Sequence, residues 1–367
     1  MKEVIRWGIL GTGQIAHQFA AGLAYVDDAQ LCAVGARSKT KAEEFSKQHS
    51  ISRHYGSFEA LLAEPDIDVV YIATPHHVHH DHCVMALEAG KSVLCEKPFT
   101  INAKQAREVI ELARRKNLFC MEAMWMRFIP AIRQMTELLE NDTIGEPGVL
   151  RADFGVPFEF NPAGRVFDPD LAGGALLDLG VYTVSLSYLL FGAPVEILAT
   201  ANIGESGVDE TSTIVLKHAG GQISTLRSSI RYELAPEAVV VGSKGSIRIE
   251  SPVYRPHKIQ VSKHSLVKPV ADASGTPSKI KKIIQQSPVL QKLALRVESY
   301  LTPISGAMGT RVIPFVGNGY NYQVAAVNQC LKDGKLESEI MPLDETLGVL
   351  KVMDEVRQQW GLQYAGE

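Results

Sequence analysis

The sequence predicts an α/β protein: a doubly wound parallel sheet is followed by an α+β domain with a large open, mainly antiparallel sheet. Two patterns along the chain support this prediction. Up to about residue 123, short and continuously apolar runs alternate with helical patterns, which is typical of a parallel sheet covered by helices on both faces. After residue 145, longer runs with partial polar alternation follow one another between glycine-containing turns, which favours antiparallel strands.

The first domain is predicted over residues 1–123. Its strands are the apolar runs at residues 4–10, 31–36, 69–74, 92–95 and 119–123. Its helices are the patterns between them, at residues 14–23, 41–48, 58–63, 79–89 and 103–116. This alternation predicts crossover connections, which join strands that run in the same direction.

The second domain is predicted over residues 124–367. Its strands are expected at residues 148–155, 195–202, 212–216, 222–230, 238–241 and 246–249, and its helices at 174–190, 319–332 and 344–360. Residues 262–310 form a basic insertion with seven Lys or Arg residues and only two acidic ones. We interpret this insertion as a solvated excursion from the sheet. The alternatives are a flap over the functional site and a subunit contact.

Composition narrows the class of protein. The chain has 367 residues, 46% of them hydrophobic and 21% charged, which allows two domains and a sizeable core. The net charge of -4 gives no electrostatic reason to expect nucleic acid or an anionic membrane as a partner. The five cysteines are odd in number and lie mostly in apolar runs, so we expect reduced thiols and a cytoplasmic location. We recognise neither a signal peptide nor an uncharged run that could span a bilayer.

A glycine-rich turn follows the first strand and opens a helix. Gly11 permits the tight turn, Gly13 lets the backbone approach a pyrophosphate, and Ala16 allows close packing of helix on sheet. The free N–H groups and positive dipole end of the helix favour a phosphate. We therefore predict a dinucleotide-binding Rossmann domain, whose cofactor contacts include Gly11, Thr12, Gly13, Gln14 and Ile15. The alternative is a turn that binds no ligand.

The end of the second strand indicates which dinucleotide binds. An NAD site usually has Asp or Glu here, but no acidic residue occurs before Glu43. Arg37 offers a planar guanidinium that suits a phosphate, and Ser38 adds a hydroxyl donor. We therefore expect NADP rather than NAD, unless Arg37 is only an exposed loop charge.

Histidines cluster after the strand at residues 69–74. Five of the eleven histidines lie between His76 and His82, but Asp81 is the only carboxylate beside them, so we expect no metal site. We expect this strand end to approach the nicotinamide half of the cofactor, with contacts from Thr74, Pro75 and His79.

Two charges follow the strand at residues 92–95. Glu96 and Lys97 lie at the carboxyl edge of the parallel sheet, where ligands bind in such folds. Pro98 ends the strand because it has no N–H to offer. We predict that Lys97 acts in the chemistry and that Glu96 supports the site near the cofactor.

A loop at residues 173–182 leads into a helix. Asp178 and Tyr182 are four residues apart, so we expect them to share one helical face and, with Lys97, to form a proton-transfer set. A nearby ammonium would lower the pKa of Tyr182 toward working pH. The alternative is a structural tyrosine hydrogen-bonded to Asp178. We count Trp125 and Arg127, which follow the first domain, among the cofactor contacts because they can line the cleft; the alternative is that they only pack at the hinge.

These motifs, in this order, resemble those of the glucose–fructose oxidoreductase, inositol dehydrogenase and MocA (Gfo/Idh/MocA) family. The resemblance covers nearly the whole chain and rests on residues 11–16, 73–79, 96–98, 173–182 and 317–339. Within the family, the chain is most similar to dimeric dihydrodiol dehydrogenases and NADP-linked sugar dehydrogenases. The basic insertion at residues 262–310 departs from the family pattern.

The resemblance implies roles for the residues. Lys97 would position the substrate oxygen, Tyr182 would be the general acid/base, and Asp178 would orient the site. Many members of the family have His where this chain has Tyr182, whereas the dihydrodiol branch has Tyr. The expected substrate is a sugar, cyclic polyol or trans-dihydrodiol, oxidised at a secondary alcohol or formed from the ketone. Candidate substrate-lining residues are Arg165, Phe167 and Asp168.

The family resemblance also implies a homodimer or higher homo-oligomer that forms through the open sheet. The alternative function is a non-catalytic NADP-binding sensor or regulatory protein. The presence of Lys97, Asp178 and Tyr182 favours an enzyme. A further possibility is an enzyme whose tightly held cofactor cycles without release.

Overall fold

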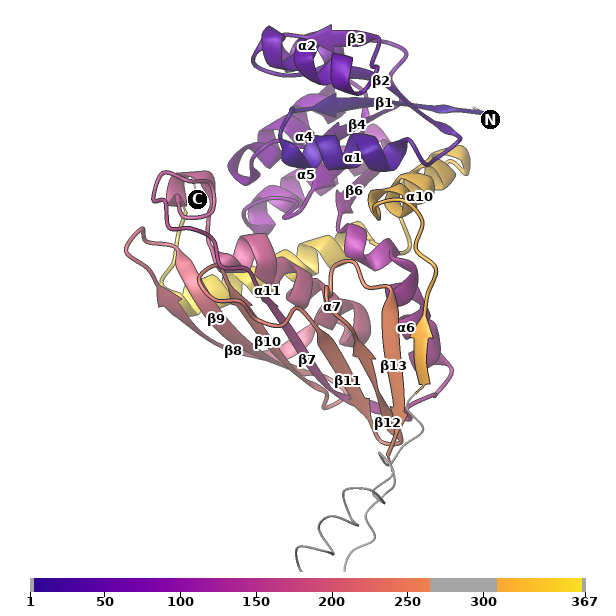
Figure 1. Ribbon diagram of the computed structural model, residues 1–367. Coiled ribbons are helices and arrows are strands. Elements are labelled where there is room, and N and C mark those ends of the chain that lie inside the picture. The colour runs from indigo at the N-terminus through magenta and orange to yellow at the C-terminus, as the bar shows by residue number, and fades with distance from the viewer. Residues whose placement is uncertain (1–2, 265–308, 365–367) are drawn as a thin grey trace, which may run out of the picture.

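The computed structural model describes residues 3–264 and 309–364, which form two sheets with helices (Figure 1). The predicted basic insertion therefore lies outside the described residues, apart from its ends. The strands that flank it, β13 (Lys258–Lys263) and β14 (Gly309–Val312), pair with each other in antiparallel fashion.

The first sheet has six strands in the order β3-β2-β1-β4-β5-β6, and every pair is parallel. This is the order of a doubly wound dinucleotide-binding fold, so the predicted Rossmann architecture is confirmed. Its strands are β1 (Ile5–Leu10), β2 (Ala29–Gly35), β3 (Arg53–Tyr55), β4 (Val69–Ile72), β5 (Ser92–Glu96) and β6 (Cys120–Ala123). The sequence analysis missed β3 because this edge strand has three half-buried residues and no apolar run.

Helices α1 (Gln14–Leu23), α2 (Lys39–Gln48), α3 (Phe58–Leu62), α4 (His79–Glu88) and α5 (Ala103–Lys116) connect these strands. Side-chain oxygens cap three of them, because Ser38, Ser57 and Asn102 each accept a hydrogen bond from a backbone N–H of the first turn. No side chain caps α1. This helix therefore begins with backbone donors that a ligand can use.

The second sheet has eight strands in the order β14-β13-β12-β11-β7-β10-β9-β8. The strands not yet introduced are β7 (Pro147–Gly155), β8 (Pro194–Ile203), β9 (Asp209–His218), β10 (Ile223–Ser229), β11 (Ala238–Gly242) and β12 (Gly245–Ile249). The pairing is antiparallel throughout except between β7 and β10, so the mainly antiparallel prediction is confirmed. The parallel pair was not predicted, because it joins strands that are distant in the sequence.

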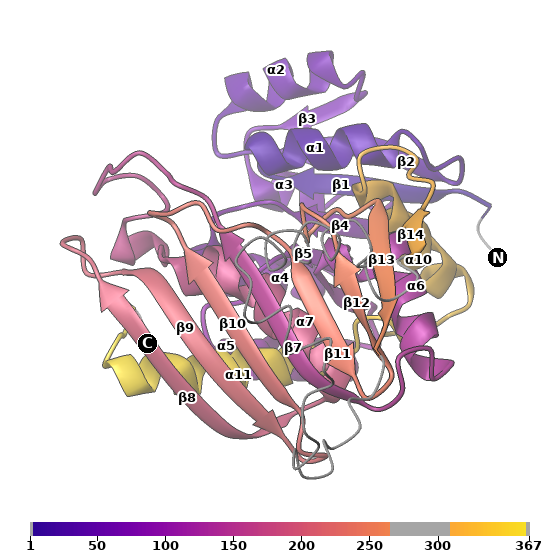
Figure 2. The same cartoon turned by 60° about the horizontal axis from the view of Figure 1, so that its bottom comes forward.

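Helices cover one face of the second sheet. Figure 2 shows α7 (Val181–Phe191) and α11 (Leu343–Trp360) behind the strands, and no helix of the described residues in front of them. Helix α6 (Pro130–Glu140) packs near β12 and β13, and α10 (Tyr320–Lys332) returns to pack on α1 of the first sheet. The indole N–H of Trp7 in β1 donates to Asn328 of α10 at 3.0 Å. Late residues of the chain therefore stabilise the cofactor-binding sheet.

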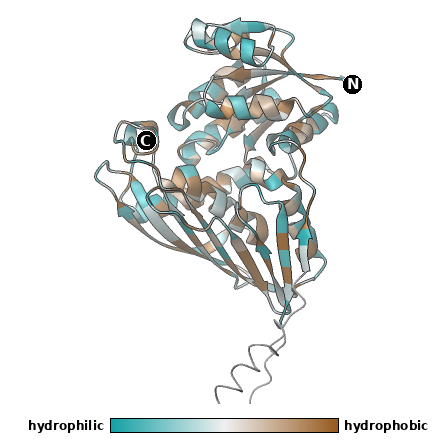
Figure 3. Cartoon of the chain, in the orientation of Figure 1, coloured by the Kyte–Doolittle hydropathy of each residue, from teal (hydrophilic) through white to brown (hydrophobic). Residues whose placement is uncertain are grey.

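Hydrophobic side chains gather inside both layers. In Figure 3 the outer helix α2 is largely hydrophilic, whereas strands of the second sheet carry hydrophobic residues. The stretch Pro169–Phe191 is long and apolar enough to cross a membrane, but 78% of its most apolar window is buried in the fold. It packs against β7 and β10 as a core segment.

Candidate active site

A cleft of about 810 Å³ opens at the carboxyl ends of strands in the first sheet. Residues of both domains line it, since Glu96 and Lys97 belong to the first and Arg165 and Asp178 to the second. All of the predicted cofactor-binding residues line this cleft except Trp125 and Arg127.

The glycine-rich turn leaves room for a pyrophosphate. Gly11 has φ +107°, and a Cβ on it would lie 2.7 Å from the carbonyl oxygen of Ala73, so only glycine fits. A Cβ on Gly13 would meet nothing within 4 Å. Open space in front of an uncapped helix N-terminus suits the phosphates of a dinucleotide.

Positive charges line the cleft near the end of β2. Arg37 is exposed there, and Lys41 of α2 lines the same wall, although the sequence analysis had not selected Lys41. The Oγ of Ser38 accepts a hydrogen bond from the backbone N–H of Lys41 at 3.4 Å, so its own O–H remains available as a donor. This donor set fits a phosphate group.

His79 lies between two loops of the cleft, the one after β4 and the one after β5. Its Nδ1 lies 2.8 Å from the carbonyl oxygen of Pro98, and its Nε2 lies 2.7 Å from that of Thr74. Burial lowers the pKa of His79 to about 4. A neutral ring has a single N–H, so it donates to one of the two carbonyls. His79 therefore lines the cleft as predicted, and its single N–H fixes the ring to the backbone of one of the two loops, after β4 or after β5.

Asp178 is the meeting point of three basic side chains. The Nζ of Lys97 donates to the backbone oxygen of Asp178 at 2.7 Å and to its Oδ1 at 3.3 Å. Arg165 donates to both carboxylate oxygens, at 3.1 and 3.3 Å, and Nε2 of His76 lies 3.9 Å from Oδ1. Although burial opposes it, the charges of Lys97, Arg165 and His76 hold the pKa of Asp178 well below its usual range.

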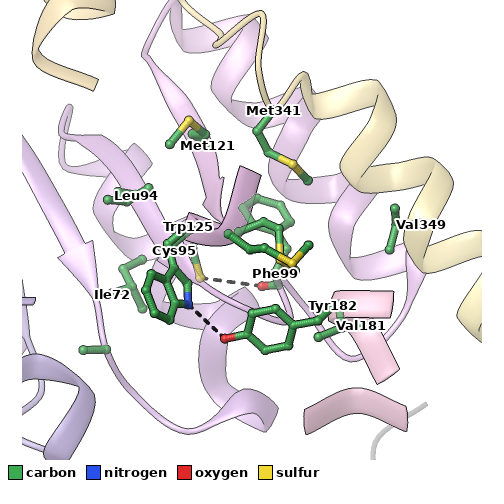
Figure 4. Close-up of a cluster of buried hydrophobic side chains, with 14 of the residues drawn as sticks. Ile72, Leu94, Cys95, Phe99, Met121, Trp125, Val181, Tyr182, Met341 and Val349 are labelled. Carbon is green, nitrogen blue, oxygen red and sulfur yellow. Dashed lines mark hydrogen bonds between the residues drawn. The ribbon is translucent and has the colours of Figure 1, made fainter. Parts of the chain in front are cut away.

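Tyr182 is buried beside this cluster. Its phenolic oxygen accepts a hydrogen bond from the indole N–H of Trp125 at 2.9 Å (Figure 4), and the Nζ of Lys97 lies 4.9 Å from its ring centroid. Burial, together with the negative charges of Glu96 and Asp178, raises the pKa of Tyr182 well above its usual value. The expectation that Lys97 lowers this pKa is therefore wrong for this arrangement: Lys97 lies against the ring and pairs with Asp178.

The helix that carries these two residues is not a regular α-helix. Residues Leu176–Gly180 form a π-helical turn, and α7 begins only at Val181. Asp178 pairs with Lys97 and Arg165, whereas the phenol of Tyr182 pairs with Trp125. The expectation of a regular α-helix through both residues is corrected, but the Nζ of Lys97 still meets both side chains, at 3.3 Å from Oδ1 of Asp178 and 4.9 Å from the ring centroid of Tyr182. No hydrogen bond joins Tyr182 to Asp178 in the part of the chain that the structure describes.

Trp125 and Arg127 lie at the domain interface and do not line the cleft. They belong to the 3-10 turn Trp125–Phe128, which follows β6. Arg127 is fully buried, donates to the hydroxyl of Ser185 at 2.9 Å, and forms an ion pair with Glu345. The prediction that Arg127 contacts the cofactor is corrected, because its guanidinium fastens α7 to α11.

Only one of the three predicted substrate residues reaches the cleft, namely Arg165. Phe167 is buried against Phe160, with ring centroids 5.1 Å apart. The carboxylate of Asp168 caps the short turn Pro169–Leu171 by accepting from the N–H of Asp170 at 2.9 Å. Both are therefore structural.

The structure adds residues that sequence reasoning had not assigned to the cleft. Besides Lys41, these include Gln18, Phe58, His76, His77 and His82. The histidine cluster was visible in the sequence, but nothing in it indicated which rings face the cleft. Within residues 3–264 and 309–364, no group of three or more His, Cys, Asp or Glu side chains could hold a metal ion.

The fold and the cleft define a two-domain protein that binds a dinucleotide and brings Lys97, Asp178 and Tyr182 together beside it. Comparison with models of known protein families identifies the family. Residues 5–124 match the GFO/IDH/MocA oxidoreductase family, NAD-binding Rossmann fold, and residues 132–248 match the GFO/IDH/MocA C-terminal domain. The chain belongs to the GFO/IDH/MocA family of oxidoreductases. The resemblance seen in the sequence motifs is thereby confirmed.

Curated relatives match the chain over nearly its whole length. It is 36% identical over 363 residues to a trans-1,2-dihydrobenzene-1,2-diol dehydrogenase of Xenopus laevis, covering 98% of this chain and 99% of that protein. The Mus musculus enzyme of the same name is 35% identical, with 98% of each chain covered. A crystal structure of a 3-ketoreductase from Actinomadura kijaniata, with NADP and TDP-benzene, superposes with a TM-score of 0.78 at 23% identity, covering 97% of each chain. That last likeness concerns the fold.

Proposed function

We propose that the protein is an NADP-dependent dehydrogenase or reductase that interconverts a secondary alcohol and a ketone on a sugar, cyclic polyol or trans-dihydrodiol. The observation that carries the proposal is the position of Lys97. Its ammonium lies at the end of the dinucleotide cleft, against the Tyr182 ring and hydrogen-bonded to Asp178. The names of the curated relatives support a vicinal diol as substrate.

The residues of the cleft suit NADP. The open space at Gly13 and the uncapped start of α1 would hold the pyrophosphate. Arg37 and Lys41, with the hydroxyl of Ser38, would hold a 2′-phosphate. When bound, the nicotinamide accepts or supplies the hydride.

Lys97 and Tyr182 would divide the work on the substrate oxygen. An ammonium has three donors, and Asp178 accepts two of them, so one N–H of Lys97 remains for the substrate oxygen. The phenolate form of Tyr182 would accept the hydroxyl proton during oxidation, and the resulting phenol would return it during reduction. Arg165 and His76 hold Asp178, which in turn fixes the position of the Lys97 ammonium.

Aromatic rings beside Tyr182 suit a flat or cyclic substrate. The ring of Phe154 meets that of Tyr182 edge-on at 5.4 Å and stacks on Tyr254 at 5.1 Å. Tyr254 is partly exposed, so its ring can meet a ligand. Such rings favour the apolar face of a cyclic diol.

The test is Lys97→Met, compared with Lys39→Met on the exposed side of α2. We expect Lys97→Met to bind NADP normally but to lose about 10²- to 10⁴-fold in turnover on a panel of aldoses, inositols and dihydrodiols. The Lys39 variant should behave like the wild type. Undiminished turnover in Lys97→Met would refute the assigned mechanism. A wild-type protein that binds NADP but turns over none of the panel would instead indicate the sensor.

We also propose that two copies of the chain pair through the open face of the second sheet. Val149, Ile223 and Val241 are neighbours across three adjoining strands. Val149 and Ile223 are 47% and 44% exposed, although both are large apolar residues. A patch of this kind, on a face that no helix of residues 3–264 and 309–364 covers, suits a self-complementary contact.

A further inference from the structure

The hydrogen bond between Trp125 and Tyr182 has only one possible direction. An indole N–H donates and cannot accept, so the phenolic oxygen of Tyr182 must be the acceptor at 2.9 Å. The two residues are 95% and 94% buried. No other hydrogen bond to this phenolic oxygen is found within residues 3–264 and 309–364. The hydrogen of the phenol is therefore left for an acceptor other than Trp125.

The indole ring is held firmly in place. Tyr320, at the start of α10, stacks on Trp125 with centroids 4.5 Å apart and planes 13° apart. Gly319 has φ +104°, and a Cβ on it would lie 2.6 Å from Cζ3 of Trp125, so a glycine is required for this contact. Helix α1 packs closely against Tyr320, because a Cβ on Gly22 would lie 2.7 Å from the Cβ of Tyr320.

We propose that Trp125 is a positioning residue for proton transfer: its indole N–H holds the phenolic oxygen of Tyr182 and directs the phenolic proton toward the substrate oxygen. The inference rests on the proposed function, because it assumes that Tyr182 moves the proton. During oxidation the substrate hydroxyl would give its proton to the phenolate, and Trp125 would donate to that phenolate throughout. During reduction the same proton would return to the substrate oxygen.

The charges around Tyr182 show why such a donor matters. Asp178 is negative, and Glu96, whose pKa burial raises to about 7, becomes negative as the pH rises. Tyr254 is a second phenol near Tyr182, and Lys97 lies over the ring with its ammonium paired to Asp178. Burial and these acidic groups disfavour the phenolate. The indole N–H of Trp125 opposes them, since a hydrogen bond to a charged oxygen is stronger than one to a neutral oxygen.

The first experiment measures the pH dependence of oxidation. In Trp125→Phe the midpoint of the rise in kcat with pH should move up by about one to two pH units, with about a 10- to 100-fold lower rate below the midpoint. Trp125→His restores a ring N–H and should return the midpoint at least halfway. A uniform fall in kcat or a rise in KM, with an unmoved midpoint, would show that Trp125 only packs.

A second measurement needs no turnover and no cofactor. The protein has three tryptophans, so the indole N–H resonance of Trp125 can be assigned by NMR from the signal missing in Trp125→Phe. Tyr182→Phe should shift this resonance and leave those of Trp7 and Trp360 in place. If Tyr182→Phe shifts none of the three indole N–H resonances, the proposal is overturned, and this outcome needs no assignment and therefore no folded Trp125→Phe.

The two proposals can fail separately. If Tyr182→Phe keeps its turnover, the proposed function fails, and the role of Trp125 fails with it. If Tyr182→Phe is inactive but the midpoint of Trp125→Phe is unmoved, only the role of Trp125 is lost.

Discussion

The ammonium of Lys97 and the backbone oxygen of Asp178 lie 2.7 Å apart, although the two residues are 81 positions apart in the sequence and belong to different domains. Lys97 follows the last residue of β5, and Asp178 lies in the π-helical turn before α7. The contact joins the cofactor-binding sheet to the second domain. It also places a charged donor in the cleft that residues of both domains line.

Asp178→Asn should destabilise the protein, because the largely buried ammonium of Lys97 and the guanidinium of Arg165 then lose the carboxylate between them. Breaking a fully buried pair costs roughly 3–5 kcal/mol, but Arg165 is partly exposed, so we expect a loss of about 1–3 kcal/mol at neutral pH. Denaturant unfolding measures this change. The pKa of Asp178 is lower in the folded state than in the unfolded state, where it is ~3.9. The ionised carboxylate therefore stabilises the fold fully above that pH, and this stabilisation is lost as the pH falls further. The difference in free energy of unfolding between Asp178→Asn and the wild type should therefore become smaller below about pH 4. A difference in unfolding free energy that does not change with pH would contradict the idea that the ionised Asp178 carboxylate supplies the stability.

Glu122→Gln should stabilise the protein at alkaline pH. The side chain of Glu122 is buried, and burial raises its pKa to about 7. The folded state therefore binds more protons than the unfolded state between about pH 4.3 and the folded pKa, so wild-type stability falls as the pH rises through that window. The variant lacks this penalty, and its advantage in urea unfolding should grow by about 1–3 kcal/mol from pH 5 to pH 8. Glutamine can still accept from the N–H of Phe99. Glu44→Gln, on the exposed side of α2, is the control, and equal pH slopes for all three proteins would refute the argument.

Arg37→Ala should weaken NADP binding about 10- to 100-fold and leave NAD binding nearly unchanged, because only NADP carries the phosphate that the guanidinium would hold. Isothermal titration with each cofactor measures this selectivity. Lys41→Ala should also lower the preference for NADP over NAD, but by a smaller factor, since an ammonium makes no bidentate contact. Lys39→Ala, whose side chain does not line the cleft, is the control. An equal loss for NAD and NADP would mean that Arg37 acts on the fold and not on the phosphate.

Ile223→Glu should weaken self-association, because it places a charge in the apolar patch shared with Val149 and Val241. We expect a dimer dissociation constant at least about 100-fold higher, measured by analytical ultracentrifugation. Tyr25→Glu, at an exposed position on the first domain, is the control. A dimer unaffected by Ile223→Glu would place the interface elsewhere.

The sequence predicted much of the fold and of the cofactor cleft. Both the parallel sheet and the glycine-rich turn at Gly11 follow from local patterns of apolar and small residues. The polar edge strand β3 and the parallel pairing of β7 with β10 were missed. Neither has a local pattern that distinguishes it, since the pairing depends on how distant strands assemble.

The site was predicted less completely. Lys97 and Asp178 do meet, but the phenol of Tyr182 pairs with Trp125, and Arg127 turns into the core. Helical periodicity assumed regular α geometry, whereas the chain makes a π-helical turn just before Tyr182. Nothing in the spacing of the residues signals that turn.

The sequence by itself determined most of the strands and helices, the turn at Gly11 and the positive charge at Arg37, because each depends on neighbours within a few residues. The tertiary structure alone decided that Lys97 pairs with Asp178 and that the indole of Trp125 faces the phenol of Tyr182. Those contacts join residues 81 and 57 positions apart, so both depend on the direction in which distant side chains point, and the first depends also on how the two domains pack.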